Sequence, residues 1–344
     1  MTWPRVLLVA DPSPTQLGAH LIDAANSLGV DLRLCATPDA YGGPALVRKA
    51  SWWLGGRRPA RLRAFSATVL ETARAWRPDV VLTTGLAPVA AAALAEIGRL
   101  RIRRLNFSTD DPWNPAHAAP WFLRALPMYD VVFSPRRANL DDLRRAGVAR
   151  VAYLPFGYNP RAHRPEPPAT DAERARFAAD VMLAGGADAD RVRVVAPLID
   201  AGFSVALYGG YWTRFAATRR HARGMLDEAG LRRATATAKV CLGLVRRANR
   251  DGHAMRTFEV PAMNGCLLAE RTPDHTELFG ADGLAVRYFE RPDEAVEQVA
   301  ALLADAGMRD RLVARAHEIV VTGRHTYADR LATMLTTTEQ QHDA

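Results

Sequence analysis

The sequence predicts two α/β domains, each built on a doubly wound parallel sheet, that face a central cleft. Short apolar strands alternate with helices of ten or more residues, and a parallel neighbouring strand can be reached only through such a crossover. The alternation restarts after a proline-rich run at 155–168. In addition, a chain of 344 residues exceeds the usual size of one hydrophobic core. These three observations favour two domains of ordinary size.

In the first half, the apolar run at 6–10 predicts a buried strand, and Gly29 ends the helical pattern that follows it. The later strands of this half are expected at 30–35, 80–84, 102–107, 131–134 and 151–154, and its later helices at 65–76, 88–100 and 137–146. This order gives residues 1–155 one parallel sheet.

The run PFGYNPRAHRPEPP at 155–168 contains five prolines, which neither a helix nor a central strand tolerates. We therefore expect an interdomain hinge at 156–175, a second domain at 176–336 and a disordered tail at 337–344. The second domain is expected to have strands at 181–184, 205–208, 240–244 and 266–269, and helices at 191–201, 232–239, 257–263 and from 292 onward.

Composition narrows the class of protein. Cys35, Cys241 and Cys266 each stand alone among apolar residues, so we interpret them as core residues rather than metal ligands. The N-terminal apolar run is too short for a signal core or a membrane span, so a cytoplasmic protein is expected. The net charge of +8 suits an anionic ligand, a phosphate-bearing substrate or an anionic membrane surface. Nucleic acid is not expected, because aromatic residues interleave with basic ones only around residues 52–53.

The segment Arg48–Arg63, RKASWWLGGRRPARLR, is basic and apolar and has no acidic residue. It resembles an interfacial anchor, which gives peripheral membrane contact as one interpretation. The other is an ordinary loop and helix start whose tryptophans pack on the N-terminal domain.

The segment Asn249–Glu270 carries the clearest chemical signal. It places a polar loop before a helix that opens near Thr257, where backbone amides and the helix dipole favour a phosphate and Arg256 adds a cation. Glu259 has the right chemistry to accept both hydrogen bonds of a ribose diol. Alternatively, Glu259 only complements the helix dipole and Arg256 pairs with a surface acid.

Two longer motifs extend this signal, RTFEVPAMNGCLLAERTPDHTELF from residue 256 and HTYADRLATML from residue 325. They resemble the C-terminal domain of the CgeB-type, spore-maturation-like glycosyltransferases, which have the two-Rossmann GT-B fold and are similar to the family-4 glycosyltransferases. RPDVVLTTG, STDDPW, YDVVFSP and YLPFGYNP extend the resemblance into the first half. The resemblance implies an enzyme that moves a sugar from a nucleotide diphosphate-sugar, bound by the C-terminal domain, to an acceptor bound by the N-terminal domain.

The same resemblance implies a set of donor-binding residues. Family-4 enzymes bind the donor through two acidic residues spaced as Asp251 and Glu259 are here, although Asp251 is one methylene shorter than the family's glutamate. Arg256 would contact the diphosphate and Gly186 would approach it closely. The further donor-binding residues would be Arg191, Gly252, His253 and Thr257, with Tyr208, Gly209, Gly210 and Trp212 bordering the base pocket.

The acceptor side is less determined. An inverting enzyme needs a general base, for which His20, Asp110 and Asp111 are the candidates. His20 could also be an ordinary helix residue and Asp110 a turn cap before Pro112, and a retaining enzyme could use the leaving diphosphate instead. We expect no metal and no cofactor beyond the nucleotide diphosphate-sugar as co-substrate. A nucleotide-sugar epimerase or hydrolase on the same scaffold and a non-catalytic basic binding module are the alternatives.

Overall fold

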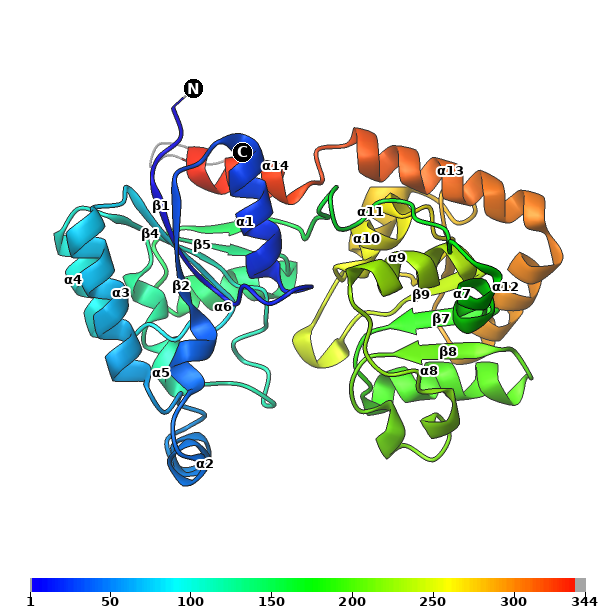
Figure 1. The fold of residues 1–344 in the computed structure, drawn as a ribbon, viewed down its shortest axis with the longest axis horizontal. Helices are drawn as coiled ribbons and strands as arrows, with labels where there is room; N and C mark the ends of the chain where they lie inside the picture. Colours follow the sequence, from blue (N-terminus) through cyan, green and yellow to red (C-terminus); the bar gives the residue numbers. More distant parts are fainter. Residues whose placement is uncertain (1, 338–344) are drawn as a thin grey trace. The chain divides into compact units, whose positions relative to one another are not determined.

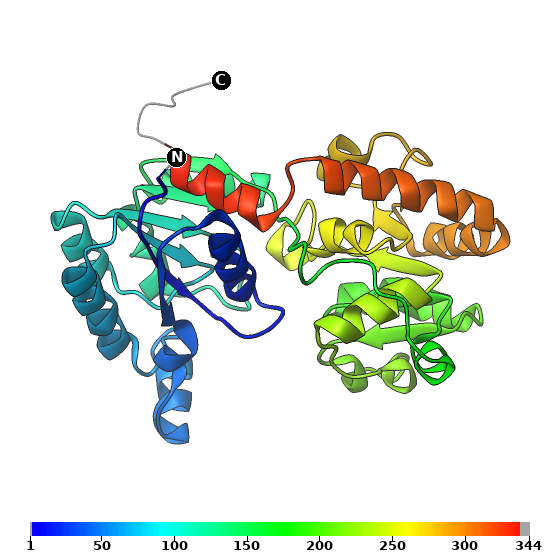
Figure 2. The ribbon, with the colours of Figure 1, turned by 45° about the horizontal axis from the view of Figure 1, so that its top comes forward.

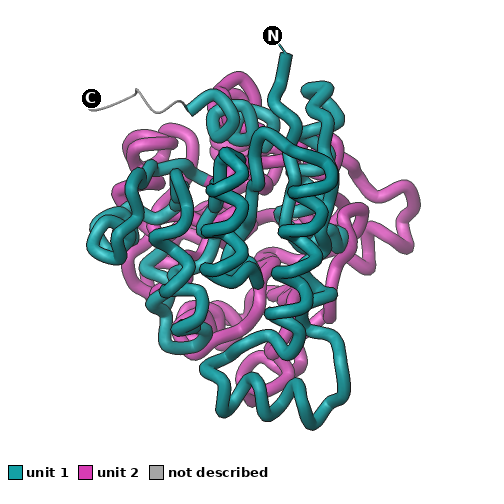
Figure 3. Tube along the Cα trace, turned by 90° about the vertical axis from the view of Figure 1, so that its left-hand side faces the viewer, with its two compact units in different colours: residues 1–155, 248–251, 327–344 teal, residues 156–247, 252–326 magenta. Residues whose placement is uncertain are grey.

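The computed structural model describes residues 2–337, which form two compact units. Among these residues, unit 1 comprises 2–155, 248–251 and 327–337, and unit 2 comprises 156–247 and 252–326 (Figure 3). Each unit is an α/β structure with its own parallel sheet (Figure 1). The predicted fold class, two Rossmann-like doubly wound domains, is therefore confirmed.

The sheet of unit 1 has the order β2-β1-β3-β4-β5-β6, and all of its pairs are parallel. Leu7 and Val9 of β1 belong to a buried cluster with residues of α3 and α4, and α1 packs on β1 with Leu21 buried. The strands are β1 (Val6–Ala10), β2 (Leu32–Ala36), β3 (Val80–Thr84), β4 (Arg103–Phe107), β5 (Val131–Ser134) and β6 (Val151–Tyr153). The helices are α1 (Leu17–Leu28), α2 (Ala45–Leu54), α3 (Leu62–Trp76), α4 (Ala91–Arg99), α5 (Pro120–Leu123), α6 (Leu140–Arg145) and α14 (Tyr327–Thr336).

The sheet of unit 2 has the order β11-β10-β9-β7-β8 and is also parallel throughout. One buried cluster joins its strands to α8, α12 and α13. The strands are β7 (Val181–Ala184), β8 (Val205–Tyr208), β9 (Val240–Gly243), β10 (Leu267–Glu270) and β11 (Arg287–Phe289). The helices are α7 (Asp171–Phe177), α8 (Ala189–Asp200), α9 (Glu228–Thr237), α10 (Arg256–Ala262), α11 (Pro273–Phe279), α12 (Pro292–Ala304) and α13 (Ala306–Thr322).

The division of the chain differs from the predicted boundaries at three places, one of which is 248–251, a segment of the predicted second domain that belongs to unit 1. Residues 156–175 belong to unit 2, and α7 begins there because the Thr170 side chain accepts a hydrogen bond from the Glu173 amide. Helix α14 belongs to unit 1, where it packs on α1, and Tyr327 stacks on His20 (Figures 1 and 2). An amphipathic pattern predicts such a helix but not which core receives it. Of the predicted tail, 338–344 lies outside the described residues.

Several element boundaries were also wrong by a few residues. The helix expected at 232–239 begins at Glu228, because Asp227 caps it, and the helix expected at 137–146 is a 3₁₀ turn at Arg137–Asn139 followed by α6. The three cysteines are buried and form no disulfide, as expected for core residues. Among the described residues, no helix is both long and apolar enough to cross a membrane.

Candidate functional site

Two glycine loops meet at the carboxyl ends of β7 and β8 in unit 2. The Gly185 amide donates to the carbonyl oxygen of Tyr208 at 2.8 Å, and the Ala187 amide donates to that of Gly210 at 2.9 Å. A Cβ atom at Gly209 would lie 2.5 Å from the Gly185 carbonyl oxygen, and its φ of +120° also requires glycine. The backbone of the loop after β7 is therefore held in one shape.

Three arginines surround this loop. The Nε of Arg256 donates to the carbonyl oxygen of Ala184 at 3.1 Å, and Nη1 of Arg191 donates to that of Gly186 at 2.8 Å. The guanidinium of Arg246 lies about 4.0 Å from where a Cβ atom of Gly186 would stand. We call Arg191, Arg246 and Arg256 the arginine cluster.

Asp188 is the acidic neighbour of two members of the arginine cluster, Arg191 and Arg246. This residue caps α8 by accepting from the Arg191 amide at 2.9 Å, and its carboxylate lies 3.9 Å from Nε of Arg191 and 3.8 Å from Nε of Arg246. The loop between a first strand and its helix is the usual place for a phosphate in doubly wound folds. Guanidinium groups also match phosphate oxygens in geometry and charge. The arrangement therefore suits a diphosphate.

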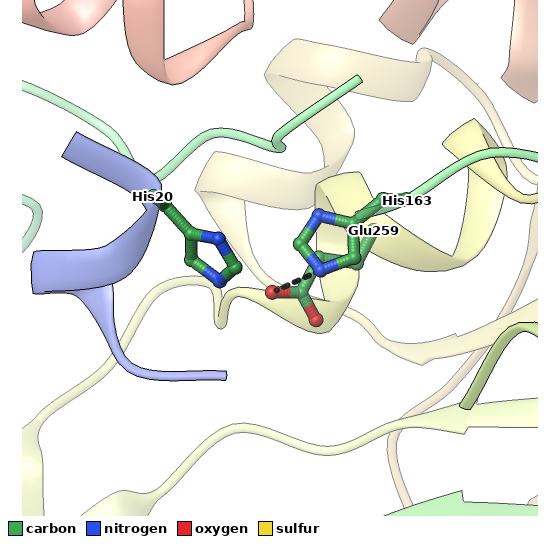
Figure 4. Close-up of side chains that lie close together, drawn as sticks. All are labelled: His20, His163 and Glu259. Atoms are coloured by element: carbon green, nitrogen blue, oxygen red, sulfur yellow. Dashed lines mark ion pairs between the residues drawn. The ribbon is translucent and has the colours of Figure 1, made fainter. Parts of the chain in front are cut away.

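Glu259 lies one turn along α10 from Arg256, and the two form an ion pair. Its side chain is only 1% exposed, and a carboxylate oxygen lies 3.5 Å from Nε2 of His163 (Figure 4). The sequence had left open that Arg256 pairs with a surface acid, but its partner is the buried Glu259. His163 was missed, because nothing in the run 155–168 connects it with α10.

The predicted source of free amides at α10 was wrong. The helix begins at Arg256, and the amides of Thr257 and Phe258 donate to the carbonyl oxygens of Ala254 and Met255, each at 3.0 Å. That tight first turn uses amides that a phosphate would need. The contribution of α10 is thus its side chains.

Thr257 takes part in a buried hydrogen-bond chain. The carbonyl oxygen of Glu270 can only accept, so Nδ1 of His275 donates to it at 2.7 Å. Nε2 of His275 then accepts from the Thr257 hydroxyl at 2.9 Å, and this hydroxyl accepts from the Ala254 amide. Burial lowers the pKa of His275 to about 4 against the opposing effect of the Glu270 bond, so the imidazole is neutral. The chain ties α10 to β10.

Gly252 and His253, the two residues after Asp251, have structural roles within unit 2. A Cβ atom at Gly252 would lie 2.2 Å from the Asp274 carboxylate, so only glycine fits. Nε2 of His253 accepts from the Phe156 amide at 3.1 Å, and Nδ1 donates to Asp274 at 3.0 Å. Asp251 itself belongs to unit 1, where its buried carboxylate forms an ion pair with Arg136.

A pocket of about 650 Å³ lies at the carboxyl ends of β9, β10 and β11. The Glu270 carboxylate on its wall accepts from the Val245 amide at 2.7 Å and lies 3.4 Å from Nη2 of Arg247. Arg246 of the arginine cluster lies between Val245 and Arg247 in the sequence. The pocket is lined by Val245, Arg247, Glu270, Arg271, Thr272, Pro273, Thr276, Phe289 and Glu290.

Of the residues predicted to border the base pocket, Gly209 and Gly210 form the second glycine loop, and none of the four lines the 650 Å³ pocket. Tyr208 and Trp212 are buried, and Nε1 of Trp212 donates to the Gly185 carbonyl oxygen at 2.8 Å, which fixes the glycine loop. The exposed aromatic of this loop is Tyr211, with φ +74° and the Arg214 guanidinium 4.2 Å from its ring centroid.

One pocket of unit 1, of about 390 Å³, lies at the carboxyl ends of β1, β2, β3 and β4. Asp110 lies on its wall, with one carboxylate oxygen 3.5 Å from where a Cβ atom of Gly85 would stand. Burial, and then the charge of Asp110, raises the pKa of the Tyr41 hydroxyl on the same wall. Sequence reasoning missed Asp11, although its position directly after the first strand was a usable signal. Further lining residues include Asp11, Trp52, Arg57, Thr109, His117 and Trp121.

The other two candidates for a general base have different surroundings. The buried Asp111 carboxylate accepts from the Trp113 amide, from Asn139 and from two nitrogens of Arg250, at 2.6 to 3.0 Å. His20 is buried and stacks on Tyr327 with ring centroids 5.3 Å apart. Of the three candidates, Asp110 is the one that lines the pocket of unit 1.

Two doubly wound parallel sheets with their sites at the carboxyl ends of the strands define the GT-B class of fold. A family model described as glycosyl transferase-like matches residues 191–336. No curated protein sequence matches the chain significantly.

Solved structures with the same fold span nearly the whole chain. Sucrose-phosphate synthase from Thermosynechococcus elongatus is 13% identical, covers 96% of this chain and 98% of its own, and has a TM-score of 0.63. Anabaena Alr3699/HepE in complex with UDP is 13% identical, covers 97% and 100%, and has a TM-score of 0.62. UDP-GlcNAc 2-epimerase from Neisseria meningitidis bound to UDP-GlcNAc is 11% identical, covers 92% and 98%, and has a TM-score of 0.50.

Proposed function

We propose that this protein is a glycosyltransferase of the CgeB type, which moves a sugar from a nucleotide diphosphate-sugar to an acceptor. The observation that carries the proposal is the arginine cluster around the glycine loop of unit 2. The match of residues 191–336 to a glycosyl transferase-like family supports it, because this range contains all three arginines. Unit 2 would bind the donor and unit 1 the acceptor.

The diphosphate of the donor would lie against Gly186 and the arginine cluster. Transfer leaves a nucleoside diphosphate with a growing negative charge on its terminal oxygen, and preorganised cations stabilise that charge. Three guanidinium groups supply what a divalent cation supplies elsewhere, so we propose a metal-independent reaction. Activity that persists in a chelator supports this part, and activity that returns only with added Mg²⁺ or Mn²⁺ overturns it.

The nucleoside would occupy the 650 Å³ pocket, which is lined by Val245 and Arg247, the chain neighbours of Arg246. We propose a uridine nucleotide, because Alr3699/HepE was solved with UDP and also with UDP-glucose. Glu259 remains our candidate for the ribose hydroxyls. Its ion pair with Arg256 gives it a second role, which is to position that guanidinium.

On the acceptor side, we propose Asp110 as the general base of an inverting transfer. It lines the pocket of unit 1, whereas the Asp111 carboxylate is already occupied by four donors. A base has to reach the acceptor hydroxyl to take its proton. Asp111 is therefore better suited to hold the loop that presents Asp110.

The epimerase alternative has support of its own, because a UDP-GlcNAc 2-epimerase shares the fold. The two reactions differ in their need for an acceptor. We would incubate the protein with UDP-sugars, with and without a panel of hydroxyl acceptors, and follow UDP release and sugar configuration. Acceptor-dependent UDP release supports the proposal. A changed sugar that stays attached to UDP, in the absence of acceptor, establishes the epimerase instead.

A further inference from the structure

Helix α2 is the least buried element of unit 1. None of its ten residues is buried, and it projects from the body of the unit (Figures 1 and 2). Leu46, Trp53 and Leu54 are 82%, 78% and 88% exposed. A helix that leaves such side chains in water lacks the usual reason for folding, which is burial of an apolar face.

The exposed apolar residues of α2 form one continuous face. Leu46, Ala50 and Leu54 recur at every fourth position, and at 3.6 residues per turn Val47 and Trp53 flank them on the same side. Trp52 lies away from this face on the helix and lines both the 390 Å³ pocket and a groove of about 280 Å³. An apolar stripe ending in tryptophan is typical of helices that lie in a membrane interface.

The charges around this face are of one sign. No acidic residue occurs between Asp39 and Glu71. In that interval the basic residues are all at least partly exposed: Arg48, Lys49, Arg57, Arg58, Arg61 and Arg63. Basic side chains beside an embedded apolar face attract the headgroups of anionic lipids. Nucleic acid would use the same cations but has no use for exposed leucine and valine side chains.

The C-terminal end of α2 is held against the wall of the 390 Å³ pocket of unit 1, which is the proposed acceptor pocket. Arg57, three residues beyond the helix, donates to the carbonyl oxygens of Ala118 and Pro115 at 2.8 and 2.6 Å, and Nε1 of Trp121 donates back to that of Arg57 at 3.2 Å. Tyr41 and Trp52 line both the 390 Å³ pocket and a groove of about 280 Å³ under α2. The helix and the pocket are thus neighbouring parts of one surface.

We infer that α2 docks unit 1 on an anionic membrane, with Leu46, Val47, Trp53 and Leu54 in the interface and the surrounding arginines and Lys49 on the headgroups. The docking itself follows from α2 alone. Its consequence rests on the proposed function: the acceptor pocket stands at the membrane surface, where it takes a sugar acceptor carried by a lipid.

The test is co-flotation of the full chain with vesicles of phosphatidylcholine alone or mixed with phosphatidylglycerol. We expect binding to the anionic vesicles, weakened by salt, and roughly a fivefold loss of partitioning for each cation removed by Arg48→Ala or Lys49→Ala. The double variant Trp53→Glu/Leu54→Glu should not float. The matched control Met225→Glu/Leu284→Glu, which adds the same charges at exposed apolar sites of unit 2, should float like the wild type.

Three outcomes overturn the inference. They are no flotation of the wild type, equal flotation of both double variants, and retention of the wild type on RNA or on a protein partner with no vesicle binding. UDP affinity, measured separately by calorimetry, should be the same in all variants. If UDP does not bind but flotation follows α2, the proposed function fails while the docking stands.

Discussion

The Nε of Arg256 donates a hydrogen bond to the carbonyl oxygen of Ala184, which lies 72 positions earlier in the chain and 3.1 Å away. Ala184 ends β7, the strand that leads into Gly185 and Gly186, so this bond brings the first residue of α10 to the first loop of the unit-2 sheet. Arg191 and Arg246 reach the same loop from two other segments. The account of donor binding depends on this convergence.

Removing one arginine of the cluster should weaken UDP binding, and Arg256→Ala should also lower the Tm because it leaves the buried Glu259 carboxylate without this cation. Hydrogen bonds to charged groups contribute about 1.5–3 kcal/mol, so Arg246→Ala or Arg256→Ala should raise the Kd for UDP by roughly 10- to 100-fold. Arg193→Ala is the matched control, because this exposed arginine of α8 pairs with Asp190. Calorimetric titration gives the Kd for UDP of the three variants. An equally large loss of UDP affinity in Arg193→Ala would mean that only the net charge matters.

Glu259 has two proposed roles, ribose binding and positioning of Arg256. Comparing the affinities for UDP and for uridine distinguishes them. Glu259→Ala should weaken UDP binding by about 1.5–3 kcal/mol. If Glu259 binds the ribose, the affinity for uridine falls as well. If it only positions Arg256, uridine affinity is unchanged while that of UDP falls. An unchanged Kd for both ligands in a folded variant would refute both roles.

Gly209 is required by the close approach of two loops. Gly209→Ala puts a Cβ atom 2.5 Å from a backbone carbonyl oxygen at a φ of +120°. Such strain costs of the order of 1–3 kcal/mol, and each kcal/mol lowers the Tm of a unit of this size by about 2–4 °C. Gly210→Ala, where a Cβ atom meets nothing within 4 Å, is the control. Thermal unfolding of both variants compares them, and an equal Tm would contradict the geometry.

Stability should fall with acidification partly through His275. Its pKa is about 4 in the folded protein against the usual 6.5, so the unfolded chain binds the proton first. The neutral His275 contributes of the order of 3 kcal/mol to the free energy of unfolding. This contribution is fully present above pH 6.5 and is lost as the pH falls through 4. His275→Gln should flatten urea-unfolding free energies between these pH values. An unchanged pH dependence in His275→Gln would contradict this role of His275.

Asp110 and Asp111 should separate catalysis from stability. Asp110→Asn should reduce the rate of sugar transfer by roughly 10²- to 10⁴-fold and leave the Kd for UDP unchanged, as expected for a lost general base. Asp111→Asn should lower the Tm, because it removes one of the two carboxylates, those of Asp111 and Asp142, that pair with the Arg250 guanidinium. Full transfer activity in Asp110→Asn would exclude this residue as the base.

Alternating strands and helices were sufficient to predict both sheets, because periodicity reports local structure directly. Gly186, Arg191 and Arg256 were predicted as one site from a family resemblance, and they do lie together. Arg246 was missed, since the run 246–250 contains three arginines and only the fold shows which one reaches the loop.

Long-range pairing was beyond the sequence pattern. The spacing of Asp251 and Glu259 suggested a common ligand, but the Asp251 carboxylate pairs with Arg136, which lies 115 positions earlier in the chain. Likewise, Trp212 was predicted to border the base pocket, and its buried side chain donates to the Gly185 carbonyl oxygen. A motif records which residue types are present, whereas burial and partners depend on the whole fold.

A crystal structure of the protein with UDP tests the central claim most directly. Our account predicts the two phosphates against Gly186, within hydrogen-bond distance of the guanidinium groups of Arg191, Arg246 or Arg256, and the uracil in the pocket beside Val245. A diphosphate bound elsewhere, with the arginine cluster in contact only with its own carbonyl oxygens and carboxylates, would contradict it.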